Sequence, residues 1–200
     1  MSPQADFYFD YGSPPSYLAY AQMPGVAERT GAVIHYKPIL LGGVFQATGN
    51  ASPMDVPAKR QWMLQDMAFF ARRYGVAFRH NPHFPINTLH LMRGAIHAQR
   101  QGFLIPYSNA IFRAMWADGV DLSQPARIAD VLDKAGIDAA AVMAATQDPA
   151  VKDALKAETE AAVKRGLFGA PVVFVGDEMF FGQDRVPYAE ERLGGERRLS

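Results

Sequence analysis

The 200-residue sequence contains no cysteine, and this absence excludes several kinds of chemistry. Without thiols the chain cannot build a disulfide framework, bind zinc or an iron–sulfur cluster through cysteine, or supply its own thiol nucleophile. An excess of charge is also missing, because 20 Lys and Arg residues balance 20 Asp and Glu residues. We therefore expect no binding of nucleic acid through bulk positive charge.

Long apolar runs are absent as well. No stretch approaches the roughly 18–20 uninterrupted apolar residues that a membrane span needs. Residues 1–6 lack the basic segment followed by an apolar run that marks a secretion signal. The sequence thus predicts a cytoplasmic protein without a membrane partner, and its 49% hydrophobic residues are enough for a substantial core.

The N-terminal part predicts a strand, a helix and a second strand. Residues 7–10 are aromatic and precede turn residues, and Ser13, followed by two prolines, is typical of a helix start. Pro24 and Gly25 predict a kink or a break in that helix. Residues 33–38 are typical of the second strand.

Residues 58–146 predict only helices. The expected segments are residues 58–74, 88–101, 107–117, a helix that Ser123 caps and that ends at Gly136, and 139–146. They are followed by a helix over 149–165, a hairpin of strands over 171–175 and 178–181, and a final helix that ends at 193. This order predicts an α/β protein with a thioredoxin-like fold and an all-helical insertion. Residues 1–57 and 147–200 would form the thioredoxin-like domain, and 58–146 the insertion.

Ser13 lies at the predicted turn from strand to helix, where unpaired backbone N–H groups and the helix dipole favour an anion. Its hydroxyl either only caps the helix or, with nearby amides, stabilises an oxyanion or a thiolate that a ligand brings. A self-sufficient serine nucleophile is disfavoured, because no His or Lys is placed nearby to act as its base.

Three other places have two interpretations each. Ala170 precedes a proline that either opens a strand or forms a cis bond beside which an extended peptide can pair. Asp184 either caps the last helix or binds a ligand ammonium group. Asn50 and Lys59 belong to a polar segment that is either solvated surface or folds over a ligand carboxylate.

The histidines do not indicate a metal site. His80 and His83 lie in an expected loop, and neither an HExxH motif nor a cluster of carboxylates accompanies them. The methionine and aromatic residues over 63–70 and 112–116 have helical spacing. This spacing is typical of a core, one end of which can line an aromatic substrate pocket.

Several motifs together resemble the 2-hydroxychromene-2-carboxylate isomerase family, over about residues 6–193. This family is related to kappa-class glutathione transferases and, more distantly, to DsbA-like oxidoreductases, which have Cys-x-x-Cys where this chain has Ser-Pro-Pro-Ser. The resemblance is carried by Phe7-Tyr8-Phe9-Asp10, Ser13-Pro14-Pro15-Ser16-Tyr17-Leu18, Gly169-Ala170-Pro171 and Gly176-Asp177-Glu178-Met179-Phe180-Phe181-Gly182-Gln183-Asp184-Arg185.

The resemblance implies a glutathione-dependent isomerase that interconverts 2-hydroxychromene-2-carboxylate, a small aromatic carboxylate, and trans-o-hydroxybenzylidenepyruvate in naphthalene-type catabolism. It implies that Ser13 hydrogen-bonds the glutathione sulfur and that the protein is a homodimer. The residues that it implies for glutathione binding are Asn50, Lys59, Ala170, Phe181, Gly182, Gln183 and Asp184. Pro15 and Ala170 depart from the commoner aromatic residue and valine, and Pro15 affects the substrate side of the pocket.

Two other functions use the same motifs. A kappa-like glutathione transferase would employ the same thiolate but release a conjugate. A non-catalytic thioredoxin-fold module would bind a peptide beside Pro171 without chemistry. Consumption of glutathione would distinguish the transferase from the isomerase. A lack of glutathione binding would favour the non-catalytic module.

Overall fold

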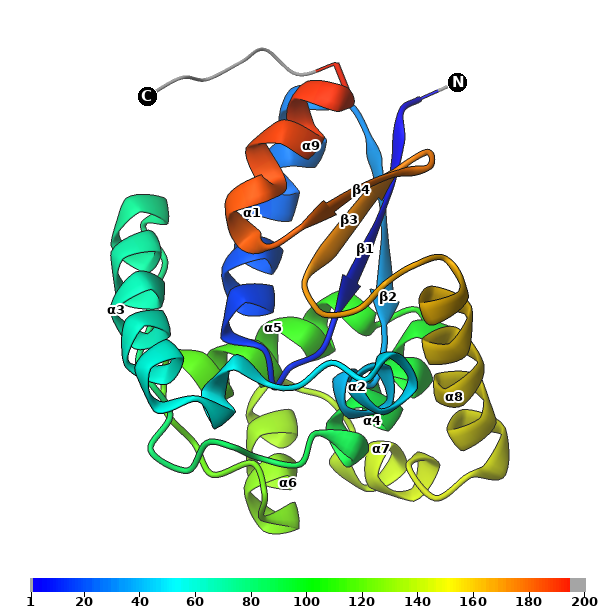
Figure 1. The fold of residues 1–200 in the computed structure, drawn as a ribbon. Coiled ribbons are helices and arrows are strands. Elements are labelled where there is room, and N and C mark those ends of the chain that lie inside the picture. Colours follow the sequence, from blue (N-terminus) through cyan, green and yellow to red (C-terminus); the bar gives the residue numbers. More distant parts are fainter. Residues whose placement is uncertain (1, 195–200) are drawn as a thin grey trace.

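Aromatic and β-branched residues form one mixed sheet in the computed structural model, which describes residues 2–194 (Figure 1). The strands are β1 (Gln4–Phe9), β2 (Val33–Pro38), β3 (Val172–Val175) and β4 (Glu178–Phe181), in the order β2-β1-β3-β4. β1 is parallel to β2 and antiparallel to β3, which is antiparallel to β4. The predicted four-stranded sheet and the C-terminal hairpin are confirmed.

Helices make up most of the remaining chain. They are α1 (Pro14–Thr30), α2 (Leu41–Thr48), η1 (Pro53–Asp55), α3 (Pro57–Tyr74), α4 (Leu89–Arg100), α5 (Leu104–Trp116), α6 (Pro125–Lys134), α7 (Ala139–Ala145), α8 (Pro149–Lys164), η2 (Gln183–Arg185) and α9 (Val186–Arg192). Figure 1 shows α1 and α9 beside one another along the sheet, α8 beyond β2, and α3 at the outer edge. Within residues 2–194, none of these helices is long and apolar enough to cross a membrane.

The structure corrects three local predictions. A break at Pro24, one of the two predicted alternatives, is wrong: α1 continues through it, because its buried face, including Met23 and Val26, holds the helix across the one missing hydrogen bond. Ser123 does not cap α6, since its hydroxyl donates to the Asp121 carboxylate at 2.6 Å and the helix begins after Gln124. α5 begins at Leu104, ahead of the predicted start at 107.

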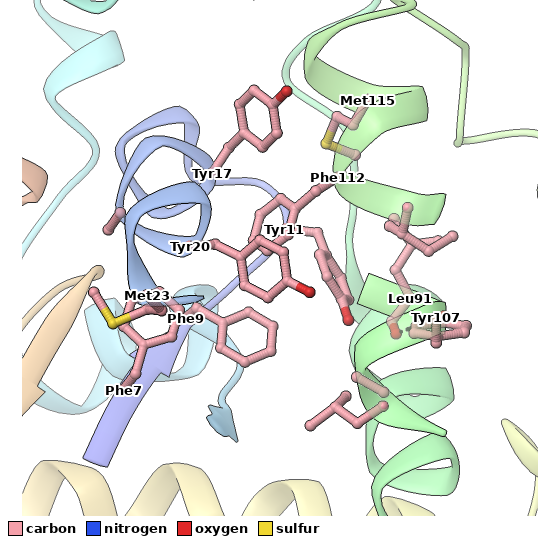
Figure 2. Close-up of a cluster of buried hydrophobic side chains, with 14 of the residues drawn as sticks. Phe7, Phe9, Tyr11, Tyr17, Tyr20, Met23, Leu91, Tyr107, Phe112 and Met115 are labelled. Carbon is pink, nitrogen blue, oxygen red and sulfur yellow. Dashed lines mark hydrogen bonds between the residues drawn. The ribbon is translucent and has the colours of Figure 1, made fainter. Parts of the chain in front are cut away.

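A single large core joins the sheet to the helices of the insertion. Figure 2 shows Phe9 and Tyr11 from the N-terminal segment packed against Phe112 of α5, with the rings of Tyr11 and Phe112 4.7 Å apart. The Trp116 Nε1–H donates to the Tyr11 carbonyl at 2.7 Å, and the hydroxyls of Tyr11 and Ser108 are also 2.7 Å apart. The insertion therefore packs directly against the end of β1, which leads into the start of α1.

Candidate active site

Ser13 is the N-cap of α1, as its sequence context predicts. Its extended backbone (φ −102°, ψ 108°) lets the side-chain Oγ accept a hydrogen bond from the Ser16 N–H at 3.1 Å. The Ser13 hydroxyl in turn donates to the Ala170 carbonyl at 3.1 Å, across a sequence separation of 157 residues. The helix start and the loop before β3 are thus brought together, as the two motifs require.

The backbone amides around Ser13 already have partners or lack a hydrogen. Pro14 and Pro15 have no N–H, and the Ser16 N–H is held by the Ser13 Oγ. The Gly12 N–H donates to Asp10 Oδ1 at 2.8 Å, the Ser13 N–H to the Asp10 carbonyl, and the next amide, of residue 17, to the Ser13 carbonyl. Of the residues of this turn that line the cavity, 12–15, Ser13 therefore has the one donor, its hydroxyl, that can turn toward a ligand; the Ser16 hydroxyl is buried and does not line the cavity. The prediction that nearby amides would help does not hold here.

Asp10 holds this turn in place. Its carboxylate is buried and accepts hydrogen bonds from the Gly12 N–H and from the Leu41 N–H at the start of α2, both at 2.8 Å. Burial raises the pKa of Asp10, while these backbone hydrogen bonds and one from the Thr88 side chain oppose the shift. One side chain thus joins β1, the α1 turn, α2 and the segment before α4.

A cavity of about 280 Å³ opens in front of Ser13. Its walls come from the α1 turn, α2, residues 50–54, α3, residues 169–171 and the segment 181–184. Met63 and Met67 of α3 are buried and form part of the wall, and the Trp62 side chain, which is also part of it, is mostly exposed. An apolar wall with few polar groups suits a small organic ligand. The expectation that one end of this methionine-rich core lines a pocket is confirmed.

The segment after β4 reaches the cavity with limited freedom. The Gly182 N–H donates to the Pro171 carbonyl at 3.0 Å, which joins this segment to the Ala170–Pro171 bond, a cis peptide. Gly182 has a φ of 105°, and a Cβ there would lie 2.7 Å from Asp184 Oδ1, so only glycine fits. The buried Gln183 side chain accepts a hydrogen bond from the Tyr74 hydroxyl at 2.6 Å. The Gln183 amide oxygen is therefore occupied by a hydrogen bond within the protein, whereas Asp184 lines the cavity.

Two carboxylates line the same end of the cavity. The structure places Asp66 of α3 near Asp184, and burial, followed by the negative charge of Asp184, raises the pKa of Asp66. No side chain caps α9, so Asp184 is not the cap of that helix. The sequence reasoning missed Asp66, although its position three residues after Met63 on a helix facing the pocket could have revealed it. A pair of acidic groups at a cavity wall favours a bound cation.

Of the remaining predicted residues, Asn50 and Phe181 line the cavity and Lys59 does not. Asn50 lines it, and its side-chain Nδ2 donates to the Phe168 carbonyl at 2.8 Å. Phe181 is another lining residue, and its ring packs against the ring of Phe168 with centroids 4.6 Å apart. Lys59 is exposed in the first turn of α3 and does not form part of the cavity wall. In the part of the chain that the structure describes, no three His, Asp or Glu side chains are grouped so that they could hold a metal ion.

Comparison with known proteins gives a consistent assignment. The model of the DsbA-like thioredoxin domain matches residues 4–194. The 2-hydroxychromene-2-carboxylate isomerase of Sphingobium xenophagum is 32% identical, and the alignment covers 96% of this chain and 99% of that protein. The human protein named glutathione S-transferase kappa 1 is 26% identical, with 94% and 90% of the two chains covered.

A solved structure of a 2-hydroxychromene-2-carboxylate isomerase superposes with a TM-score of 0.87, is 30% identical and covers 96% of this chain and 94% of that chain. A probable DsbA oxidoreductase from Streptomyces coelicolor has a TM-score of 0.71 at 19% identity, covers 99% of this chain and 92% of that chain, and therefore shows a shared fold alone. The predicted thioredoxin-like fold is confirmed, and the chain belongs to the 2-hydroxychromene-2-carboxylate isomerase family of DsbA-like thioredoxin-domain proteins.

Proposed function

We propose that this protein is a glutathione-dependent isomerase that interconverts 2-hydroxychromene-2-carboxylate and trans-o-hydroxybenzylidenepyruvate. The names of its relatives support this activity, since those of at least 31% identity are isomerases of 2-hydroxychromene-2-carboxylate. The observation that carries the proposal is the Ser13 hydroxyl, the one donor that the α1 turn can offer to a sulfur in the cavity. We further propose that it acts as a cytoplasmic homodimer in aromatic catabolism.

The cavity has the groups that a bound glutathione molecule needs. The Ser13 hydroxyl and the positive end of the α1 dipole favour a thiolate over a thiol. The backbone of Ala170 is at the cavity wall for pairing with a peptide, and the two carboxylates of Asp66 and Asp184 favour the α-ammonium group. The Asn50 side chain is in the wall as well. A role for Lys59 in holding a ligand carboxylate stays a prediction.

The residues of the chain act by orienting and stabilising. Glutathione held by Ser13, Ala170, Asp66 and Asp184 would supply a thiolate nucleophile for reversible addition to the conjugated double bond, which allows rotation about that bond. Ser13 turns its hydroxyl proton from the Ala170 carbonyl toward the sulfur. Met63, Met67 and Trp62 form the apolar wall against which the aromatic ring of the substrate packs. No side-chain base is required at Ser13, because the serine acts as a donor and not as a nucleophile.

The test is to incubate the protein with glutathione and 2-hydroxychromene-2-carboxylate and to quantify both. Isomerisation with all glutathione recovered supports the proposal. Stoichiometric loss of glutathione would instead indicate a transferase. Calorimetry that detects no binding of glutathione would contradict both enzyme functions.

A further inference from the structure

A second hollow lies on the other side of α2 from the cavity. Leu41 and Phe45 of α2 line the active-site cavity, whereas Gly43, Gln46 and Ala47 of the same helix line a groove bounded by α2, α4 and α8. The groove has a volume of about 500 Å³. Sites for small organic ligands commonly have volumes of about 300–1,000 Å³. None of the described residues lines both hollows, so the groove is separate from the proposed active site.

The groove combines apolar walls with positive charge. Leu40, Leu89 and Leu155 lie along it, the first two half-buried and the third buried. Its basic residues are Arg93, Lys152 and Lys156, and its acidic residues are Asp153 and Glu160, both exposed. The Lys156 ammonium is 3.9 Å from the Glu160 carboxylate, and the side chains of both are more than half exposed. Among residues 2–194, Arg93 forms no salt bridge with either of these carboxylates.

Arg93 is the unusual member of the set. Its Nε is buried and has no hydrogen-bond partner among residues 2–194. A buried donor without a partner is costly, and an arginine donor loses more than a neutral one. A guanidinium presents parallel N–H groups that match the two oxygens of a carboxylate. The terminal nitrogens of Arg93 are, unlike Nε, not buried without a partner, so a carboxylate in the groove can pair with them, while leucine side chains would cover an apolar body attached to it.

We propose that the groove between α2, α4 and α8 is a binding site for a small amphiphilic carboxylate. The carboxylate lies on Arg93, near Lys152, and the apolar body packs against Leu40, Leu89 and Leu155. The proposal does not depend on the reaction carried out in the other cavity.

Octanoate is a suitable probe, and its affinity can be measured by titration with NMR detection. We expect shifts of the Arg93 side-chain N–H signals and of the leucine methyl groups in the groove. Arg93→Gln removes the charged hydrogen bonds to the carboxylate and should therefore weaken octanoate binding by about tenfold or more. Arg100→Gln is the matched control, because Arg100 is exposed on the same helix and does not line the groove. This control should bind octanoate as the unaltered protein does.

Two further measurements use the unaltered protein and do not depend on the folding of a variant. Octanamide, which has the same body without the charge, should bind at least about tenfold more weakly than octanoate. Saturation with S-methylglutathione should leave octanoate binding unchanged. Equal affinities of octanoate and octanamide, equal affinities of the two arginine variants, or competition by S-methylglutathione would each overturn the proposal. Dissociation of an oligomer by Arg93→Gln would also overturn it, because a second copy would then cover the groove.

Discussion

Replacement of Ser13 by alanine tests the central assignment most directly. The change removes the one donor that the α1 turn can direct toward a bound sulfur, because prolines or existing hydrogen bonds account for the amides of residues 12–17 and the Ser16 hydroxyl does not line the cavity. A hydrogen bond to a charged group contributes about 1.5–3 kcal/mol. At about 1.36 kcal/mol for each tenfold change, turnover should fall by about 10- to 150-fold. The pKa of the bound thiol should rise by about one to two units.

The same substitution also removes the cap of α1, which costs about 1 kcal/mol of stability. Ser16→Ala is a matched control, because its Oγ is buried and has no hydrogen-bond partner within residues 2–194. This control also loses one hydroxyl in the first turn of α1 but keeps the N–H that bonds to Ser13. It should retain activity.

The assay is the pH dependence of turnover, together with titration of the bound thiol by its ultraviolet absorbance. A higher thiol pKa predicts that the rising limb of the profile moves to higher pH in Ser13→Ala, while glutathione affinity at low pH changes little. An unmoved profile, or an equal loss of turnover in Ser16→Ala, would refute the role of the Ser13 hydroxyl as the thiolate donor.

Three other substitutions give independent predictions. Because burial raises the pKa of Asp10 above its unfolded value of 3.8, its protonation stabilises the fold below that pH, and this stability is lost as the pH rises through the folded pKa. Asp10→Asn cannot lose stability in this way. Urea titrations at several pH values should therefore show the unfolding free energy of the variant rising, relative to that of the unaltered protein, as the pH rises. A difference that does not change with pH would contradict the raised pKa of Asp10. Asp184→Asn should weaken glutathione binding in calorimetry and lower the pKa of Asp66 in an NMR titration, since it removes a neighbouring negative charge; unchanged values would remove the pair from the ammonium site. Gly94→Ala should destabilise the protein by about 1–3 kcal/mol in urea, because the added Cβ would clash with the Tyr107 hydroxyl oxygen; full stability would mean that the two helices separate easily there.

The sequence predicts the elements whose signals are local. Asp138 and Asp148 cap α7 and α8, because an acidic residue just before a helix accepts hydrogen bonds from amides two or three residues away. Strand β3, which follows Pro171, is likewise readable from its β-branched residues. These signals need no knowledge of the rest of the chain.

The parts that were missed depend on distant contacts. Helix α2 has no side-chain cap of its own, and the carboxylate that accepts from its first N–H belongs to Asp10, 31 residues earlier. Asp66 acquires its significance from Asp184, which only the folded chain brings near it. Motif comparison located Ser13 and Ala170 separately, and their 3.1 Å hydrogen bond appears only in the structure.

The core that Tyr11 shares with α5 limits how this molecule can be divided. Tyr11 is fully buried, and its carbonyl and hydroxyl are bonded to Trp116 and Ser108, respectively. Excision of residues 58–146 would uncover Phe9 and Tyr11, and the excised helices would lose the surface against which they pack. A chimera that exchanges the helical segment between relatives must therefore carry matching residues on both sides of this contact, and the two segments should unfold together in one transition.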